Sequence, residues 1–189
     1  MKNLIYISFI IVFTTFSCCN NKVGSNQSND KGNFTNDSLN GEKLLSNKEF
    51  ILSINKTCGV NSDSCVIDKI TKNYYNQFNN LKEGEITISQ MENGIELKLN
   101  KRKTNQDKYS IKIIFVSYKN NKKVDSLVCY ESNNNPNNFV ATERLYYLNN
   151  NYLWTSDFIY DETIITAENW KKYKINHQTG KFKLIEELR

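Results

Sequence analysis

The side chains that could do chemistry in this sequence gather around two tryptophans in its last third. Four carboxylates lie beside Trp154 and Trp170, namely Asp157, Asp161, Glu162 and Glu168. Paired acids next to aromatic rings suit a glycosidase, in which the spacing of the carboxyl groups sets the mechanism. Asp157 and Asp161 also share parity with Thr155 on a predicted strand, as outward residues of a half-buried strand do. A hydrolase is therefore the weaker interpretation, and it requires Asp157, Asp161 or Glu168 to converge in a cleft with raised pKa values.

The same predicted strand, residues 151–160, places four aromatic rings on one face. They fall at even positions and are Tyr152, Trp154, Phe158 and Tyr160. Such rings usually fill the core of a sheet, since they dominate its buried area. The alternative is a ligand face that stacks on sugar rings or apolar chains inside a curved sheet. Leu153 and Ile159 on the opposite face predict a central strand buried on both sides, which favours the core.

The single histidine, His177, lies in the segment Asn176–Gly180 between two predicted strands. This composition is typical of a solvated turn. Catalysis by His177 would need a nearby nucleophile and an orienting acid, and the sequence places neither beside it. The chain also has no Gly-rich phosphate loop, GxSxG, HExxH or CxxC motif. We therefore assign no catalytic residue, no metal ligand and no cofactor.

Two cysteines, Cys58 and Cys65, enclose a turn-rich loop, and we predict that they form a disulfide. Closing a ring of about eight residues removes roughly 2.5 kcal/mol of unfolded-state entropy. A redox or metal site is disfavoured, because the spacing matches neither CxxC nor a zinc motif. Cys129 is predicted to be a buried strand thiol.

Two helices are expected to precede the strands. Ser46 and Glu49 form a capping box before a predicted helix at 47–55. A second helix, at 64–80, is indicated by apolar residues that recur at intervals of three and four; these are Ile67, Ile70, Tyr74, Phe78 and Leu81.

After Gly84 the apolar period changes to two, which indicates strands. The expected strands are two around a turn at 91–94, followed by 109–118, 123–131, 139–148, 151–160, 163–168, 170–176 and 181–186. Short connections make successive strands antiparallel. The predicted class is α+β: two N-terminal helices, then a curved antiparallel meander of about seven to nine strands, open or closed into a barrel.

The first residues have the layout of a secretory signal. Lys2 precedes an apolar run that is too short to span a membrane, and small residues precede two cysteines. We expect residues 1–17 to be a cleaved signal peptide. Residues 18–42 are polar and read as a flexible tether, and residues 43–189 are expected to form a single domain.

The segment Thr15-Phe16-Ser17-Cys18 resembles the lipobox of bacterial lipoproteins. The resemblance covers about the first 20 residues and implies that Cys18 is diacylated; in a frame shifted by one residue, Cys19 carries the lipid. Two acyl chains give stable membrane anchoring. The resemblance also implies the bacterial cell envelope, and the outer membrane in particular, because Asp does not follow the cysteine.

A formal net charge of +5 and a densest basic cluster of three residues, Lys101–Lys103, do not make a nucleic-acid surface. We expect a membrane-anchored, non-enzymatic binding module for a protein partner in the envelope, in the manner of inhibitors and immunity lipoproteins. The alternative is a carrier of an apolar or glycan ligand inside the curved sheet. The two differ in whether the rings around Trp154 fill space or surround it.

Overall fold

The computed structural model describes residues 33–34, 39–58, 65–91, 93–102, 110–134, 139–161 and 163–188. The expected signal peptide at 1–17 and the two candidate lipid carriers, Cys18 and Cys19, lie outside these described residues. Across the described ranges, no helix combines the length and the apolar character needed to cross a membrane.

The helices precede nearly all of the strands, as predicted. The elements are β1 (Asn33–Phe34), the 3-10 helix η2 (Lys43–Ser46), α1 (Lys48–Thr57), α2 (Val66–Asn79), β2 (Gly84–Met91), β3 (Ile95–Arg102), β4 (Ser110–Lys119), β5 (Lys122–Asn133), β6 (Ala141–Asn149), β7 (Tyr152–Tyr160), β8 (Ile165–Ile175) and β9 (Phe182–Glu187).

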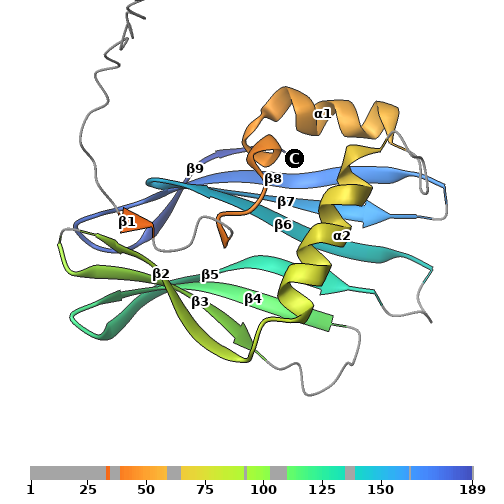
Figure 1. Ribbon diagram of the computed structural model, residues 1–189. Coiled ribbons are helices and arrows are strands. Elements are labelled where there is room, and N and C mark those ends of the chain that lie inside the picture. The colour runs from red at the N-terminus through yellow and green to blue at the C-terminus, as the bar shows by residue number, and fades with distance from the viewer. Residues whose placement is uncertain are drawn as a thin grey trace, which may run out of the picture.

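The strands form an antiparallel meander in which their spatial order follows the sequence (Figure 1). Eight long strands, β2–β9, make the sheet, and the two-residue β1 pairs with β2. The predicted antiparallel meander is thus confirmed. The barrel alternative is wrong: within the described residues, β9 pairs with β8 and not with the opposite edge.

The sheet splits in the middle. The ladder between β5 and β6 has three residue pairs, from Glu131–Arg144 to Asn133–Thr142. Beyond these pairs the two strands diverge and leave two halves, β1–β5 and β6–β9 (Figure 1).

The two halves contact each other again beyond the β5–β6 ladder, toward the β8–β9 turn. The rings of Phe115 on β4 and Tyr146 on β6 meet edge to face at 5.0 Å. Nearby, the Phe182 amide donates to the Asp125 carboxylate at 3.0 Å, and the Lys119 ammonium donates to the Gln178 carbonyl at 2.6 Å. β6, β9 and the β8–β9 turn therefore contact the other half of the sheet.

The helices cover one face of the sheet (Figure 1). α1 contacts β8, η2 contacts β6 and β7, and α2 contacts β6. The Trp170 indole donates to the Leu45 carbonyl at 2.8 Å and so ties β8 to η2. The predicted apolar face of α2 is confirmed, because Ile67, Ile70, Tyr74 and Phe78 are all buried.

α1 begins one residue later than the capping box predicts. Its N-cap is Asn47, whose side chain accepts hydrogen bonds from the amides of Glu49 and Phe50. Ser46 is the last residue of η2, and its hydroxyl donates back to the Lys43 carbonyl at 2.8 Å. The predicted cap is wrong because the preceding turn engages that hydroxyl.

One long strand, β8, replaces the two predicted strands at 163–168 and 170–176. Asn169 has a positive φ of 51°, a conformation that asparagine tolerates better than most residues. The register shifts opposite Ser156, so the strand bulges there and continues.

The packed part of the chain starts before residue 43. Leu39 is 4% exposed and belongs to the core. The Glu42 amide donates to the Tyr146 carbonyl at 3.3 Å, and Gly41 forms a bridge to Tyr147. These residues lie in the range that we assign to the tether, so its last part is held against β6.

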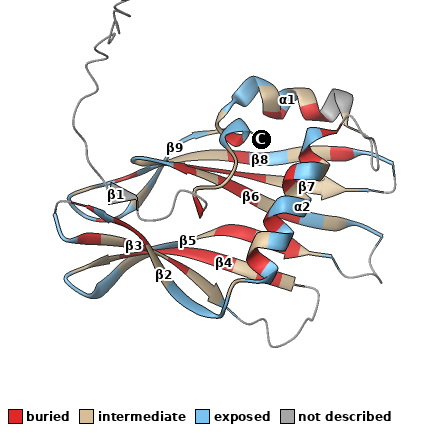
Figure 2. Cartoon of the chain, viewed as in Figure 1, coloured by how far each residue is buried: buried red, intermediate tan, exposed pale blue. Residues whose placement is uncertain are grey.

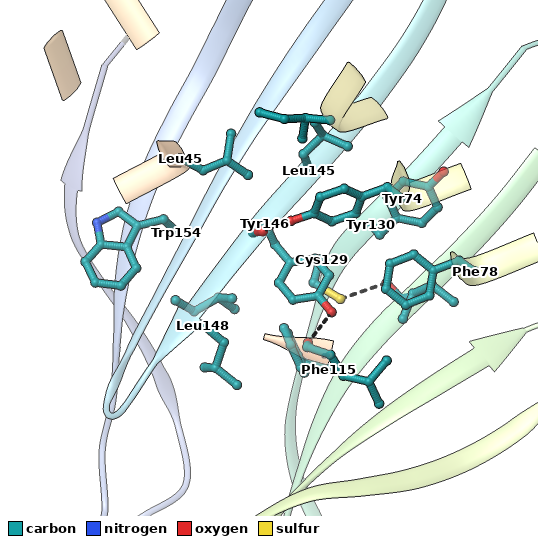
Figure 3. Packing of buried hydrophobic residues seen from close by; sticks show 14 of the residues in the cluster. Leu45, Tyr74, Phe78, Phe115, Cys129, Tyr130, Leu145, Tyr146, Leu148 and Trp154 are labelled. Carbon is teal, nitrogen blue, oxygen red and sulfur yellow. Dashed lines mark hydrogen bonds between the residues drawn. The ribbon is translucent and has the colours of Figure 1, made fainter. Parts of the chain in front are cut away.

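β7 is buried on both faces, as predicted. Leu153 and Thr155 are buried on one face, and Trp154 and Phe158 on the other. Figure 2 colours the chain by burial and shows buried residues along the strands of both halves. The core beside them is filled with side chains from both halves of the sheet and from the helices (Figure 3).

The predicted disulfide is confirmed. Cys58 and Cys65 are bonded, with their Cα atoms 5.0 Å apart. Cys58 follows α1 and Cys65 precedes α2, so the bond joins the two helices. The carbonyl of Cys58 also accepts from the Ile165 amide at 3.3 Å, which holds this corner on β8. Cys129 is a buried free thiol, as expected.

Candidate functional site

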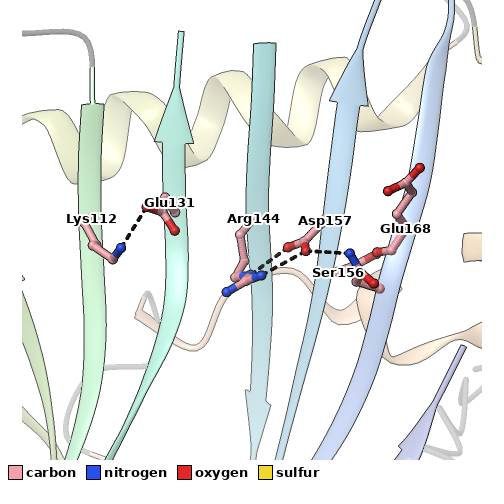
Figure 4. A network of polar contacts seen from close by, with 7 residues as sticks. Lys112, Glu131, Arg144, Ser156, Asp157 and Glu168 are labelled. Carbon is pink, nitrogen blue, oxygen red and sulfur yellow. Dashed lines mark hydrogen bonds and ion pairs between the residues drawn. The ribbon is translucent and has the colours of Figure 1, made fainter. Parts of the chain in front are cut away.

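Those acids named from the sequence that the structure describes are engaged in the sheet or exposed at its surface. Asp157 and Glu168 are directly opposed on β7 and β8. The Asp157 carboxylate turns to Arg144, however, and the Glu168 side chain points away from it (Figure 4). Asp161 is exposed after β7, and Glu162 lies outside the described residues. The arrangement does not form the acid pair that a hydrolase of this design requires.

The four aromatic residues of the predicted ligand face divide into two groups. The Trp154 ring is 8% exposed and packs on Tyr147 and Tyr152, at 5.6 Å and 5.8 Å between ring centroids. Phe158 is fully buried. These rings fill space. Tyr160, at the end of β7, borders a pocket instead.

That pocket, of about 690 Å³, lies between α2 and the adjoining ends of β5, β6 and β7. We call it the α2 pocket. The sheet contributes Asn134, Ala141, Glu143 and Tyr160, and the helix contributes Asp68, Thr71, Lys72, Tyr75 and Asn76. Its volume falls within the range of about 300–1,000 Å³ that is usual for small-molecule sites.

The helical wall of the pocket comes from one stripe of α2. The contributing positions, 68, 71, 72, 75 and 76, recur at three and four residues and so lie side by side along the helix. The stripe adjoins the buried one that begins at Ile67. Burial of the apolar stripe against the sheet therefore turns the polar stripe toward the pocket.

Glu143 is the most unusual residue of the pocket. It shares parity with Leu145 on β6, and this parity directs both side chains to the helix-covered face. Glu143 is 5% exposed. The Ser132 hydroxyl, directly opposite on β5, donates to its Oε1 at 2.7 Å. Its Oε2 is buried and has no hydrogen-bond partner among the described residues.

Burial raises the pKa of the Glu143 carboxyl from its usual value near 4.5 to about 7, although the hydrogen bond from Ser132 acts in the opposite direction. The cause is the cost of removing a charge from water. A carboxyl group in this setting can accept a hydrogen bond or an ion pair from a bound molecule.

Four other polar groups of the pocket have partners. Lys72 pairs with Asp68 at 2.7 Å along the helix. The hydroxyls of Thr71 and Tyr160 are hydrogen bonded to each other. Burial raises the pKa of Tyr160, so its phenol stays protonated near neutral pH.

Of the residues that line this pocket, the sequence indicated Tyr160 but not Glu143, although Glu143 left a readable signal. An acid at the inward parity of a strand that also carries Leu145 breaks the apolar alternation, and such a buried acid marks a candidate site. The α2 stripe gave no comparable signal, because polar residues on one side of an amphipathic helix are the norm.

His177 lies in the β8–β9 turn, as predicted. The side chain of Asn176 closes that turn by accepting from the amides of Gln178 and Thr179. Within the part of the chain that the structure describes, no three His, Cys, Asp or Glu side chains are grouped closely enough to hold a metal ion.

Comparison of the chain with protein-family models, with curated proteins and with solved structures gives no match in any of the three.

Proposed function

We propose that this chain is a lipid-anchored, non-enzymatic binding protein of the bacterial cell envelope, and that the α2 pocket is where it binds a small ligand. The observation that carries the proposal is Glu143, a buried carboxylate that lines a concave pocket of about 690 Å³ and has one oxygen without a partner among the described residues. Binding sites are typically concave and contain a few well-placed polar groups of this kind.

Binding is favoured over catalysis by the other groups of the pocket. Hydrolysis by a carboxylate pair needs two acids that act together. The second acid among the described lining residues, Asp68, is held by Lys72 at 2.7 Å. A ligand carried behind Trp154 is disfavoured, because packed side chains occupy that space.

A fragment screen by ligand-observed NMR on the full chain in detergent micelles tests the proposal. Ala141 lines the pocket and lies opposite Tyr160 on the neighbouring strand, so the substitution Ala141→Trp should fill the pocket while keeping a residue suited to a strand. We expect fragments that bind the parent chain to lose binding to this variant. Fragments that bind both proteins equally would show that the pocket is not the site.

A protein partner, the function that the sequence favours, remains a second candidate. Phe139 is 86% exposed just before β6, and Ile164 is 50% exposed just before β8, at the same end of the sheet. Apolar side chains that are exposed together in a patch are typical of protein contacts. A photo-crosslinking residue at position 139 should give a discrete adduct in cells, and Ile164→Glu should abolish it. The same crosslinking residue at Lys122, the first residue of β5 at the opposite end of the sheet, is the control.

A further inference from the structure

We infer that the α2 pocket recognises a small organic cation, which places its ammonium group on the Glu143 carboxylate and its apolar body against Tyr75 and Tyr160. This inference rests on the proposed function and adds the chemical class of the ligand. It starts from the free oxygen of Glu143. A buried carboxylate oxygen without a hydrogen bond carries a cost that a donor group removes.

The charges around the pocket select a cation over a neutral donor. Lys72 and Asp68 are paired at 2.7 Å and largely neutralise each other. Among the described lining residues, Glu143 is the remaining carboxylate. A positive ligand would therefore compensate the one charge that the pocket leaves unbalanced, and charge complementarity is a main source of specificity at such sites.

The rings beside the carboxylate suit the same ligand. Tyr75 is 41% exposed on α2, and Tyr160 lines the pocket from β7. Aromatic faces attract ammonium groups and also contact apolar bodies. The volume of about 690 Å³ leaves room for a ligand much larger than an ammonium ion.

The affinity for a cationic ligand should depend on pH through the ionisation of Glu143. Its pKa near 7 means that the ionised form becomes dominant between pH 6 and pH 8. The titratable groups that face it are Asp68, Lys72 and Tyr75 from α2, Tyr130 from β5 and Tyr160 from β7. Burial raises the pKa of both Tyr130 and Tyr160, so these two phenols stay protonated in this interval.

Three indole compounds that differ in charge provide the probes: tryptamine, its neutral alcohol analogue tryptophol, and indole-3-acetate. We expect the full chain in detergent micelles to bind tryptamine in preference to the other two, measured by calorimetry. The amine stays protonated, like that of lysine, so its affinity should rise about tenfold from pH 6 to pH 8 as Glu143 ionises. The affinity of tryptophol should not rise.

Glu143→Gln should weaken tryptamine binding at pH 8 by about tenfold or more, the usual scale for a lost charged partner, and should leave tryptophol unaffected. Glu131→Gln is the matched control, because Glu131 lies one position from Ser132 on the opposite face of β5 and pairs with Lys112. Equal binding of tryptamine and tryptophol, or no effect of Glu143→Gln, would overturn the cation inference. If fragments bind the parent chain and lose binding to Ala141→Trp, the proposed function stands without the cation inference. If no compound binds, the proposed function and the cation inference are both wrong.

Discussion

Arg144 and Asp157 face each other across β6 and β7 in a two-point ion pair. The guanidinium donates from Nε to Oδ1 at 2.6 Å and from Nη2 to Oδ2 at 2.9 Å, and the register sets the two residues directly opposite (Figure 4). The neighbouring carboxylate holds the pKa of Arg144 above its usual value. The acid that first suggests a hydrolase is thus a cross-strand partner.

Asp157→Asn should lower the free energy of unfolding by about 1–2 kcal/mol, because a paired, partly buried carboxylate contributes more than an exposed one. Urea unfolding of the full chain measures the change. Glu168→Gln, at the exposed position directly opposite on β8, is the control and should change stability by less than about 0.5 kcal/mol. Equal effects of the two substitutions would mean that the ion pair contributes nothing specific.

Glu143→Gln should stabilise the protein at alkaline pH. The folded state raises the pKa of Glu143 from near 4.5 to about 7, so the folded state binds the proton more tightly than the unfolded chain. The free energy of unfolding is therefore highest, as far as Glu143 is concerned, below pH 4.5, where its carboxyl is protonated in both states. It falls as pH rises through 7, by up to about 3 kcal/mol.

Unfolding curves of the parent chain and of Glu143→Gln between pH 4 and pH 8 check this dependence. The free energy of unfolding of the variant should not show the decline with pH that Glu143 causes in the parent chain. The difference in this free energy between the two proteins should therefore grow with pH. A constant difference over the whole range would contradict an unusual pKa at this position.

Lys101 caps the C-terminal end of α2. Its ammonium donates to the carbonyls of Phe78 and Leu81, each at 2.7 Å, and to that of Asn79 at 3.1 Å. Lys101→Met should therefore destabilise the protein by about 1–2 kcal/mol, since these helix-end carbonyls lose their partner. Thermal unfolding measures it, with Arg102→Met, an exposed neighbour of equal charge, as the control. Similar melting temperatures for both variants would refute the cap.

Opening the Cys58–Cys65 disulfide should cost roughly 2.5 kcal/mol, the entropy of a ring of about eight residues. The paired substitution to serine and reduction by dithiothreitol should give the same loss in urea unfolding. Cys129 is the free thiol of the described residues, so dithiothreitol should not further destabilise the double serine variant. A further loss there would point to another bond.

Cys18→Ala should abolish incorporation of labelled palmitate, and Cys19→Ala should retain it, if the lipobox frame is the one that ends at Cys18. Metabolic labelling in the native host, followed by immunoprecipitation, checks this result. The reverse pattern would make Cys19 the lipid carrier. Labelling that survives both single substitutions and their combination would refute the anchor.

The sequence by itself determined the local structure. The spacing of Ile67, Ile70 and Tyr74 determined α2 and its buried face, because helical periodicity is a property of neighbouring residues. The alternation of period two after Gly84 and the short connections determined an antiparallel meander. The disulfide also followed from local spacing, since its two cysteines are separated by 7 positions.

Only the tertiary structure decided how these elements meet. β5 and β6 pair over a ladder of three residue pairs that no local pattern marks, and this ladder sets Glu143 opposite Ser132 at the α2 pocket. Lys101 reaches the end of a helix more than 20 residues earlier in the chain. Such relationships come from long-range packing and from competition among hydrogen-bond partners, whereas sequence patterns report the preferences of neighbouring residues.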